Sequence, residues 1–282
     1  MEMSAQDLRK AQMLMLMIMK KIHRICEKHH IKYWLDYGSL IGAVRHGGFI
    51  PWDDDFDICM MRDDYEKFNR IAQKELGKEY FWQTWDTDPG FIFAFGKVRL
   101  KNTIWNEKRD QKVALKEKGL FVDIFPVDHV PENKFIRNLL FFIYIQIAAI
   151  LRCRNFMPRT SFKKIVAYSL RVTTTNSLLK KMLMVIINLC AQYRNSRLVS
   201  MLSLETATRN LIEKENFSEV SLHKFENTEF YIPKCYHERL QKCYGDYMTM
   251  PPKNQRIGHN VDEFDFGCYT ASLNKVFSDK GV

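Results

Sequence analysis

The sequence predicts an α+β fold, in which a mixed β-sheet with flanking helices is combined with a largely helical insertion. Up to about residue 132, short segments with apolar residues at every second position alternate with helical patterns and with glycine or proline. Residues 133–217 contain long apolar stretches, one proline and no glycine, which favours helices. Turn residues return afterwards. We therefore expect a core at 1–132, a basic helical region at 133–217 and a segment at 218–282 that completes the core domain.

The first element is expected to be a helix from Asp7 to His30, because this segment lacks proline and glycine and has apolar residues at helical spacing. Its longest apolar run, Met13–Met19, is much shorter than the roughly 20 residues that cross a bilayer. We interpret it as a helix that packs against the core.

The next elements follow from alternation, turn residues and capping residues. In order, they are a strand at Ile31–Tyr37, a Gly38-Ser39 turn, a short helix at Leu40–Arg45, a loop at His46–Trp52, a strand at Phe56–Met60, a helix from Asp64 to about Leu76 with Asp63 as its N-cap, and strands at Phe91–Arg99 and Leu120–Phe125. Pro126 is expected to end the last strand, because proline cannot donate a backbone hydrogen bond.

The composition, with 46% hydrophobic and 27% charged residues, is that of a folded protein and excludes a disordered tail. The net charge of +10 favours negatively charged partners such as phosphates, acidic lipid headgroups or nucleic acid. The positive charge is concentrated in one region of the sequence. Residues 133–200 contain twelve Lys or Arg and no Asp or Glu, and the rest of the chain sums to −2.

The cysteine pattern favours a reducing cytoplasm, because the seven cysteines have no regular spacing and no signal-peptide pattern precedes them. Cys235, His237 and Cys243 are near one another in sequence. However, the chain has no C-x-x-C unit, and this spacing matches no common zinc finger. We interpret these three residues as packing or surface residues.

Two carboxylates separated by one residue carry the most information about chemistry. If Asp55 to Ile58 is extended, Asp55 and Asp57 project from one face while Phe56 and Ile58 enter the core. Such a pair repels itself unless a cation intervenes, and its hard oxygen ligands suit Mg²⁺ or Mn²⁺ bound together with substrate phosphates. Asp53 and Asp54 precede the strand and are expected to cap, to be solvated or to support the site indirectly.

Two further features strengthen this interpretation. In the Gly38-Ser39 turn, glycine lets backbone N–H groups approach a phosphate and serine adds a hydroxyl donor. Asp123 lies between apolar residues in a predicted strand, and a carboxylate buried in this way needs a partner. We therefore predict a third acid of the same site at Asp123.

The run D-Y-G-S-L-I-G-A-V-R-H-G-G-F-I-P-W-D-D-D-F-D, from Asp36 to Asp57, resembles the signature of the LicD family, which also includes the fukutin-related proteins. Over twenty positions match without a gap. Further similarity lies in Lys97-Val-Arg99 with Thr103, in Val122–Asp128, in Tyr244–Tyr247 with Pro251, and in Arg256–His259. The resemblance thus spans Asp36 to about His259, and residues 133–217 contribute little to it.

The resemblance implies a nucleotidyltransferase-like mixed sheet and a metal-dependent phosphotransferase. Such an enzyme moves phosphocholine, or a polyol phosphate such as ribitol or glycerol phosphate, from a CDP-activated donor to a cell-surface glycan or glycolipid precursor and releases CMP. The acceptor classes include lipopolysaccharide, teichoic acid and capsule. Matched by position, Asp55, Asp57 and Asp123 would be the catalytic and metal-binding acids, and Gly38-Ser39 the phosphate turn. Asp123 could also accept the hydroxyl proton.

Several other residues are expected to bind substrate. Arg45, His46, Lys97 and Arg99 are candidates for binding phosphate, although Lys97 and Arg99 could equally form the outward face of a strand. Trp52 could contact a quaternary ammonium group through its ring, or pack as a hydrophobic staple.

The basic helical region suggests a further partner. Its first apolar run, residues 139–151, is too short for an ordinary transmembrane helix. It could be buried core. Alternatively, apolar faces bordered by Lys and Arg would suit an anionic membrane surface on the cytoplasmic side. Nucleic acid is disfavoured, because no recognition module is present. A non-catalytic membrane-binding or polyanion-binding protein is the alternative from another class.

Overall fold

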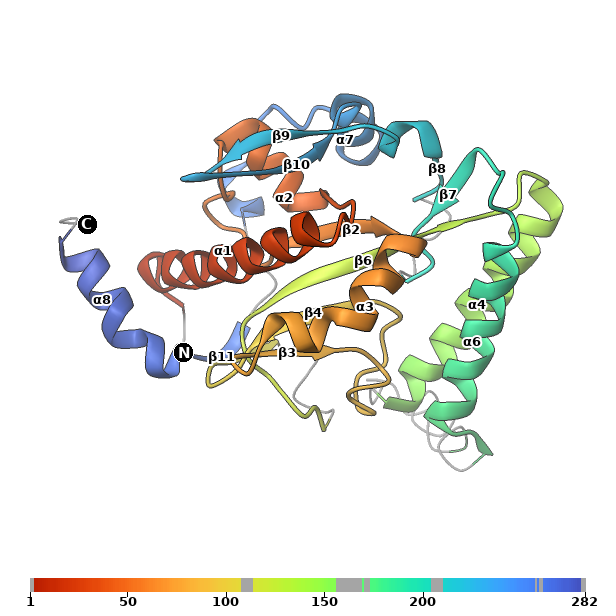
Figure 1. The fold of residues 1–282 in the computed structure, drawn as a ribbon, viewed down its shortest axis with the longest axis horizontal. Helices are drawn as coiled ribbons and strands as arrows, with labels where there is room; N and C mark the ends of the chain where they lie inside the picture. The colour runs from red at the N-terminus through yellow and green to blue at the C-terminus, as the bar shows by residue number, and fades with distance from the viewer. Residues whose placement is uncertain are drawn as a thin grey trace.

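The computed structural model describes residues 3–107, 114–155, 169, 173–203, 210–256, 258 and 261–279. Within these residues, seven strands form one mixed sheet. Five of them follow the order β1 (Trp34–Leu35), β2 (Asp57–Met61), β6 (Phe121–His129), β4 (Gly96–Leu100) and β3 (Tyr80–Gln83). β2 and β6 are parallel, and the other pairs are antiparallel. This mixed α+β arrangement agrees with the predicted class (Figure 1).

The main core lies on one face of this sheet. The helices α1 (Ala5–Lys28) and α3 (Arg62–Leu76) contribute to it, as do Ile58, Val98 and Ile124 from three neighbouring strands. Because side chains alternate along a strand, the residues between these apolar positions point to the opposite face. That opposite face carries Asp57, Lys97 and Asp123.

Residues 133–217 form helices and also add strands to the sheet. The helices α4 (Lys134–Asn155) and α6 (Asn176–Ala191) lie side by side at one end of the molecule (Figure 1) and share a second hydrophobic cluster. The short strand β7 (Leu198–Ser200) pairs with the end of β6, and β8 (Ile212–Glu213) pairs with β7. The segment is thus joined to the sheet through β7. Residues 156–168, 170–172 and 204–209 of the predicted helical region lie outside the described residues.

The C-terminal segment returns to the core. A hairpin of β9 (Val220–Phe225) and β10 (Thr228–Pro233) is followed by α7 (Tyr236–Tyr244), and β11 (Val261–Asp265) pairs with β5 (Ile104–Glu107). The last helix is α8 (Thr270–Asp279). The hairpin packs its Phe225, Phe230 and Ile232 into the main core.

The strand predicted at Leu120–Phe125 continues through Pro126 to His129, so the predicted end was wrong. The Asp123 N–H donates to the Phe56 carbonyl on the β2 side, so the nitrogen of Pro126, three residues later, faces the other edge. On that edge the pairing with β4 reaches Ile124 and the pairing with β7 begins at Asp128. Pro126 therefore occupies a gap in the ladder, where a missing N–H breaks no hydrogen bond.

Three other boundaries differ from the prediction. β1 has only two residues, because the side chain of Asp36 accepts a hydrogen bond from the Tyr37 N–H at 2.8 Å and starts a helix. Asp63 is not an N-cap; it lies in the first turn of α3, where its charge is favourable near the helix N-terminus. The strand predicted from Phe91 begins at Gly96, and the preceding phenylalanine rings pack against one another instead.

Candidate active site

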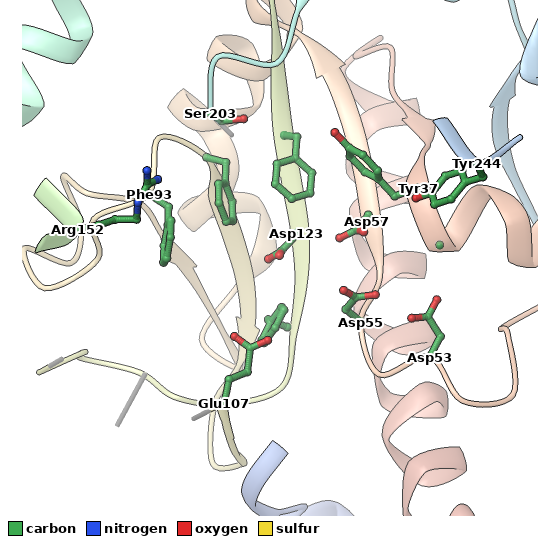
Figure 2. Close-up of a pocket in the computed structure, with 14 residues that line it drawn as sticks. Tyr37, Asp53, Asp55, Asp57, Phe93, Glu107, Asp123, Arg152, Ser203 and Tyr244 are labelled. Carbon is green, nitrogen blue, oxygen red and sulfur yellow. The ribbon is translucent and has the colours of Figure 1, made fainter. Parts of the chain in front are cut away.

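A cavity of about 470 Å³ opens over the face of the sheet that carries the acidic residues. This size is in the usual range for small-ligand sites. Figure 2 shows Asp53, Asp55 and Asp57 on one wall, Arg152 and Phe93 on the opposite wall, and Asp123 between them. The lining residues are Tyr37, Gly38, Asp53, Asp55, Asp57, Phe93, Phe95, Glu107, Phe121, Asp123, Phe125, Arg152, Ser203 and Tyr244.

Strand register brings the predicted acids together. Asp57 on β2 is paired with Asp123 on β6, and Asp123 is paired with Lys97 on β4. The three side chains therefore form a row across the sheet. Asp55 lies just before β2 and lines the same cavity, as expected from the alternation of side chains around Phe56.

The row of Asp57, Asp123 and Lys97 contains two acidic side chains and one basic side chain. The Nζ of Lys97 lies 2.7 Å from one carboxylate oxygen of Asp123 and 2.9 Å from the other, and its ammonium group also sits 3.3 Å from the centre of the Phe121 ring. Burial raises the pKa of Asp57 well above its ordinary value, and repulsion from Asp55 and Asp123 raises it further. Lys97 opposes this effect and lowers the pKa of Asp57, and an additional cation beside the carboxylate would lower it further.

The chemistry of the donor set fits a hard divalent cation at this position. Several carboxylates converge on a cavity in which the buried Asp57 repels its neighbours. Within the described residues, no three His, Cys, Asp or Glu side chains are already close enough to enclose a metal ion. Magnesium nevertheless commonly binds through one or two carboxylates and completes its shell with water and substrate phosphate oxygens.

Gly38 and Ser39 lie in the first turn of the short helix α2 (Tyr37–Ile41), not in a turn before it. Gly38 lines the cavity, and a larger residue there would collide with Asp53, because its Cβ atom would lie 2.5 Å from the Asp53 Oδ2. The Ser39 hydroxyl accepts a hydrogen bond from the Asp57 N–H at 2.9 Å. The glycine thus allows α2 to approach Asp53 in the loop before β2, and the serine links α2 to the start of β2.

The predicted substrate-binding residues Arg45, His46 and Trp52 lie outside the cavity lining. Arg45 and His46 belong to a π-helical turn, η1 (Gly42–His46), and Arg45 donates to the Tyr247 carbonyl oxygen. Trp52 does receive a cation on its ring, but that cation is the guanidinium group of Arg256, 5.1 Å from the ring centre. These residues connect η1 with the C-terminal loop, in which Ile257 and His259 lie outside the described residues.

Lys97 and Arg99 are both buried, so neither forms an outward strand face. Lys97 is paired with Asp123, as described above. Arg99 donates to Gln83 Oε1 at 2.6 Å and to the Gly119 carbonyl at 2.8 Å, and it does not line the cavity. The contacts of Arg99 hold β4 against its neighbours.

Several lining residues were not identified from sequence. Phe121 and Phe125 could have been found, because they flank Asp123 at a spacing of two and must share its face of β6. Asp53 was assigned a supporting role, yet it lines the cavity. Glu107, Arg152, Ser203 and Tyr244 come from elements distant in sequence, and no local pattern connects them with the acids.

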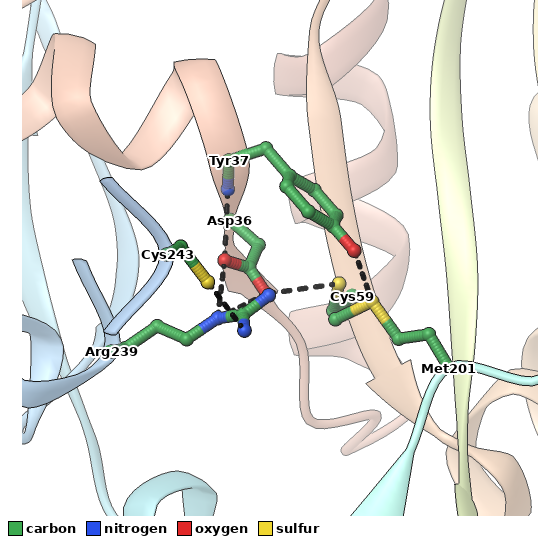
Figure 3. Close-up of polar contacts among 6 residues, drawn as sticks. All are labelled: Asp36, Tyr37, Cys59, Met201, Arg239 and Cys243. Atoms are coloured by element: carbon green, nitrogen blue, oxygen red, sulfur yellow. Dashed lines mark hydrogen bonds and ion pairs between the residues drawn. The ribbon is translucent and has the colours of Figure 1, made fainter. Parts of the chain in front are cut away.

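A buried ion pair fixes one side of the cavity (Figure 3). Arg239 on α7 donates from Nη2 to Asp36 Oδ2 at 2.9 Å and from Nε to Asp36 Oδ1 at 3.0 Å, and both side chains are 1% exposed. Asp36 directly precedes Tyr37, and Tyr244 ends the helix that carries Arg239, so the pair links the two elements that supply the cavity tyrosines. His237, on the same helix, is hydrogen-bonded to Tyr247 at 2.9 Å.

Comparison with known proteins identifies a family and relatives that are similar to this chain. Residues 30–147, which include Asp55, Asp57 and Asp123, match the LicD/FKTN/FKRP nucleotidyltransferase domain. The lipopolysaccharide cholinephosphotransferase LicD of Haemophilus influenzae is 29% identical over 267 residues, which cover 93% of this chain and 98% of that protein.

Two other relatives match shorter regions. An uncharacterised protein of Rickettsia prowazekii is 47% identical over 128 residues, or 44% of this chain and 42% of that protein. Human ribitol 5-phosphate transferase FKRP is 40% identical over 53 residues, or 19% of this chain and 11% of that protein. The match over the acidic strands and the similarity along almost all of LicD relate this chain to the LicD family and support a phosphotransferase.

Proposed function

We propose that this chain transfers phosphocholine from CDP-choline to a hydroxyl group of a cell-surface glycan or glycolipid precursor and releases CMP. The observation that carries the proposal is the cavity, in which carboxylates face aromatic rings and Arg152. The similarity to a lipopolysaccharide cholinephosphotransferase along almost the whole chain supports this choice. We further infer that the mixed sheet is of the nucleotidyltransferase type, which the matched domain supports.

Aromatic rings favour choline over a polyol. Among the described residues, six aromatic rings line the cavity, from Tyr37, Phe93, Phe95, Phe121, Phe125 and Tyr244. The faces of aromatic rings attract quaternary ammonium groups, whereas ribitol and glycerol need hydrogen-bonding partners along their length. Ribitol or glycerol phosphate transfer at the same site is the second candidate, and the similarity to ribitol 5-phosphate transferase supports it.

Mg²⁺ or Mn²⁺ is the proposed cofactor, held by Asp55, Asp57 and Asp123. When bound, the ion would neutralise the donor diphosphate and stabilise charge that develops during transfer. Arg152, on the opposite wall, is placed to contact phosphate oxygens of the donor or acceptor, since a guanidinium group can donate two parallel hydrogen bonds to a phosphate.

Side chains of this protein would accept the proton of the acceptor hydroxyl during transfer. The acceptor hydroxyl oxygen forms a bond to the phosphorus that bears choline, and the bond from this phosphorus to the oxygen bridging to CMP breaks. CMP leaves with that oxygen. The hydroxyl proton passes to a carboxylate, and Asp123 is our candidate because it lies in the centre of the row. The Lys97 ammonium, at 2.7 Å, fixes the orientation of this carboxylate.

We propose a cytoplasmic location, where a nucleotide-activated donor would be available. All seven cysteines are free thiols, which is compatible with a reducing compartment.

The test is a screen of CDP-choline, CDP-ribitol and CDP-glycerol for CMP release, with and without glycan acceptor, in Mg²⁺, Mn²⁺ or EDTA. We expect release from CDP-choline that requires a divalent ion and is lost in Asp57→Asn. Preference for CDP-ribitol or CDP-glycerol would select the second candidate. Donor binding that is independent of metal and unaffected by Asp57→Asn, with no release of CMP, would instead identify a non-catalytic binding protein.

A further inference from the structure

The helices α4 and α6 lie at one end of the molecule (Figure 1), and both expose large apolar side chains. We name these exposed side chains together the α4–α6 face. It consists of Phe135, Ile136, Leu139, Phe142 and Ile143 on α4 and Leu178, Met182, Val185 and Leu189 on α6. Phe135 is 77% exposed, Phe142 61% and Val185 58%. Monomeric soluble proteins rarely leave so many large apolar side chains together in water.

The spacing of these residues shows that each helix has two distinct apolar sides. At 100° per residue, the exposed residues of α4 occupy an arc of about 120°, and those of α6 an arc of about 60°. The buried residues, such as Phe141 and Tyr144 on α4 and Leu183 on α6, occupy the other side and form the second hydrophobic cluster. The α4–α6 face is therefore additional to the surface that holds the helices to the protein.

The charge around the face identifies its partner. Residues 133–200 contain twelve Lys or Arg and no acid. Among the described ones, Lys134 begins α4, Arg154 lies in its last turn, and the exposed Lys181 adjoins Met182. A second copy of this chain would bring the same positive charge against itself. An anionic lipid surface offers both an apolar interior for the side chains and negative headgroups for the basic ones.

We infer that the α4–α6 face docks this protein on an anionic lipid membrane, with both helices lying along the surface. By length and composition alone, α4 could also cross a bilayer, a criterion that core helices of soluble proteins also meet. However, Phe141, Tyr144, Ile147 and Leu151 tie α4 to the second cluster, and crossing would remove them from it. Docking keeps this packing intact.

The inference goes beyond the proposed function and also bears on it. Arg152, near the end of α4, lines the cavity, so the docked helix would hold the cavity close to the lipid surface. If the proposed function is correct, a lipid-linked acceptor would be presented there. Docking itself requires neither donor nor transfer, so the two ideas can fail separately.

The experiment is flotation of the full chain with vesicles of phosphatidylcholine alone or of phosphatidylcholine with phosphatidylglycerol, at low and high salt. We expect binding to the anionic vesicles that weakens as salt rises. The double variant Phe142→Gln/Val185→Gln should bind at least about tenfold more weakly. Lys181→Gln should weaken binding about fivefold at low salt only. Leu222→Gln, an exposed apolar position on β9, is the matched control and should bind like the unmodified chain.

Thermal melting verifies that each variant is folded, and sedimentation without vesicles tests self-association. Binding that depends on anionic lipid and is lost only in the α4–α6 variants supports the inference. Three results would overturn it: no binding to either vesicle, binding that the double variant leaves unchanged, or self-association through the α4–α6 face without vesicle binding.

Discussion

Asp57 is buried beside other carboxylates, and this arrangement costs stability unless a proton or a cation neutralises it. Lys97 compensates Asp123, its immediate partner, at 2.7 Å. Asp53, Asp55 and Asp57 lie together on one wall of the cavity (Figure 2), where the donor diphosphate is proposed to bind with its metal ion. The buried charge of Asp57 therefore lowers the stability of the folded protein, and a bound ion would remove this effect.

We predict that Asp57→Asn abolishes CMP release but stabilises the protein in EDTA. Burial and the neighbouring carboxylates give Asp57 a higher pKa in the folded state than in the unfolded state. Its stabilising contribution is thus complete below the unfolded pKa and is lost as pH rises through the folded pKa. At neutral pH the substitution should raise the free energy of unfolding by about 1 kcal/mol, or Tm by about 2–4 °C.

Thermal melts across the pH range, in EDTA and then in excess Mg²⁺, measure this effect. The variant should lack the stability loss that accompanies ionisation of Asp57, and Mg²⁺ should stabilise it less than the unmodified chain. Asp86→Asn, at an exposed position, serves as the control. A less stable Asp57→Asn protein in EDTA would contradict the electrostatic explanation.

At the scale of elements, α2 and α7 are held together by the pair of Asp36 and Arg239, which are separated by 203 residues in sequence. We predict that Asp36→Asn or Arg239→Met alone destabilises the protein by about 3–5 kcal/mol, because each leaves a buried charge or polar group without its partner. The double variant Asp36→Asn/Arg239→Met should be less destabilised than the sum of the single ones. Urea unfolding of the three variants tests this, and strictly additive losses would show that the pair does not act as a unit.

Local sequence patterns predicted the strands that carry Asp57 and Asp123. They failed where the structure depends on residues that are distant in the sequence. Alternation around Phe56 correctly placed Asp55 and Asp57 on one side, because strand geometry fixes side-chain direction. The end of β6 was missed, because tolerance of Pro126 depends on which strands pair along each edge. Arg239 was not identified either, since its partner Asp36 is brought close only by tertiary packing.

At the scale of the whole molecule, the cavity is built from segments that lie far apart in the chain. The acids come from β2, β5 and β6 and from the loop before β2, Tyr244 from α7, and Arg152 from α4. The family resemblance read from sequence contributed little in 133–217, yet this segment supplies the arginine opposite the acids (Figure 2). A wall assembled in this way couples the position of α4 to the shape of the site.

Arg152→Gln tests that coupling. If the guanidinium group binds phosphate, its loss should lower kcat/KM for the CDP-activated donor by about 10- to 100-fold, as expected for one charge-assisted hydrogen bond. Arg154→Gln is the matched control, because Arg154 donates to Asn176 Oδ1 at 2.9 Å and does not line the cavity. Arg152→Lys should recover part of the activity, since it keeps the charge but loses the paired donors. Equal activity of the Arg152→Gln and Arg154→Gln enzymes, both folded by thermal melting, would mean that α4 closes the cavity without contributing to catalysis.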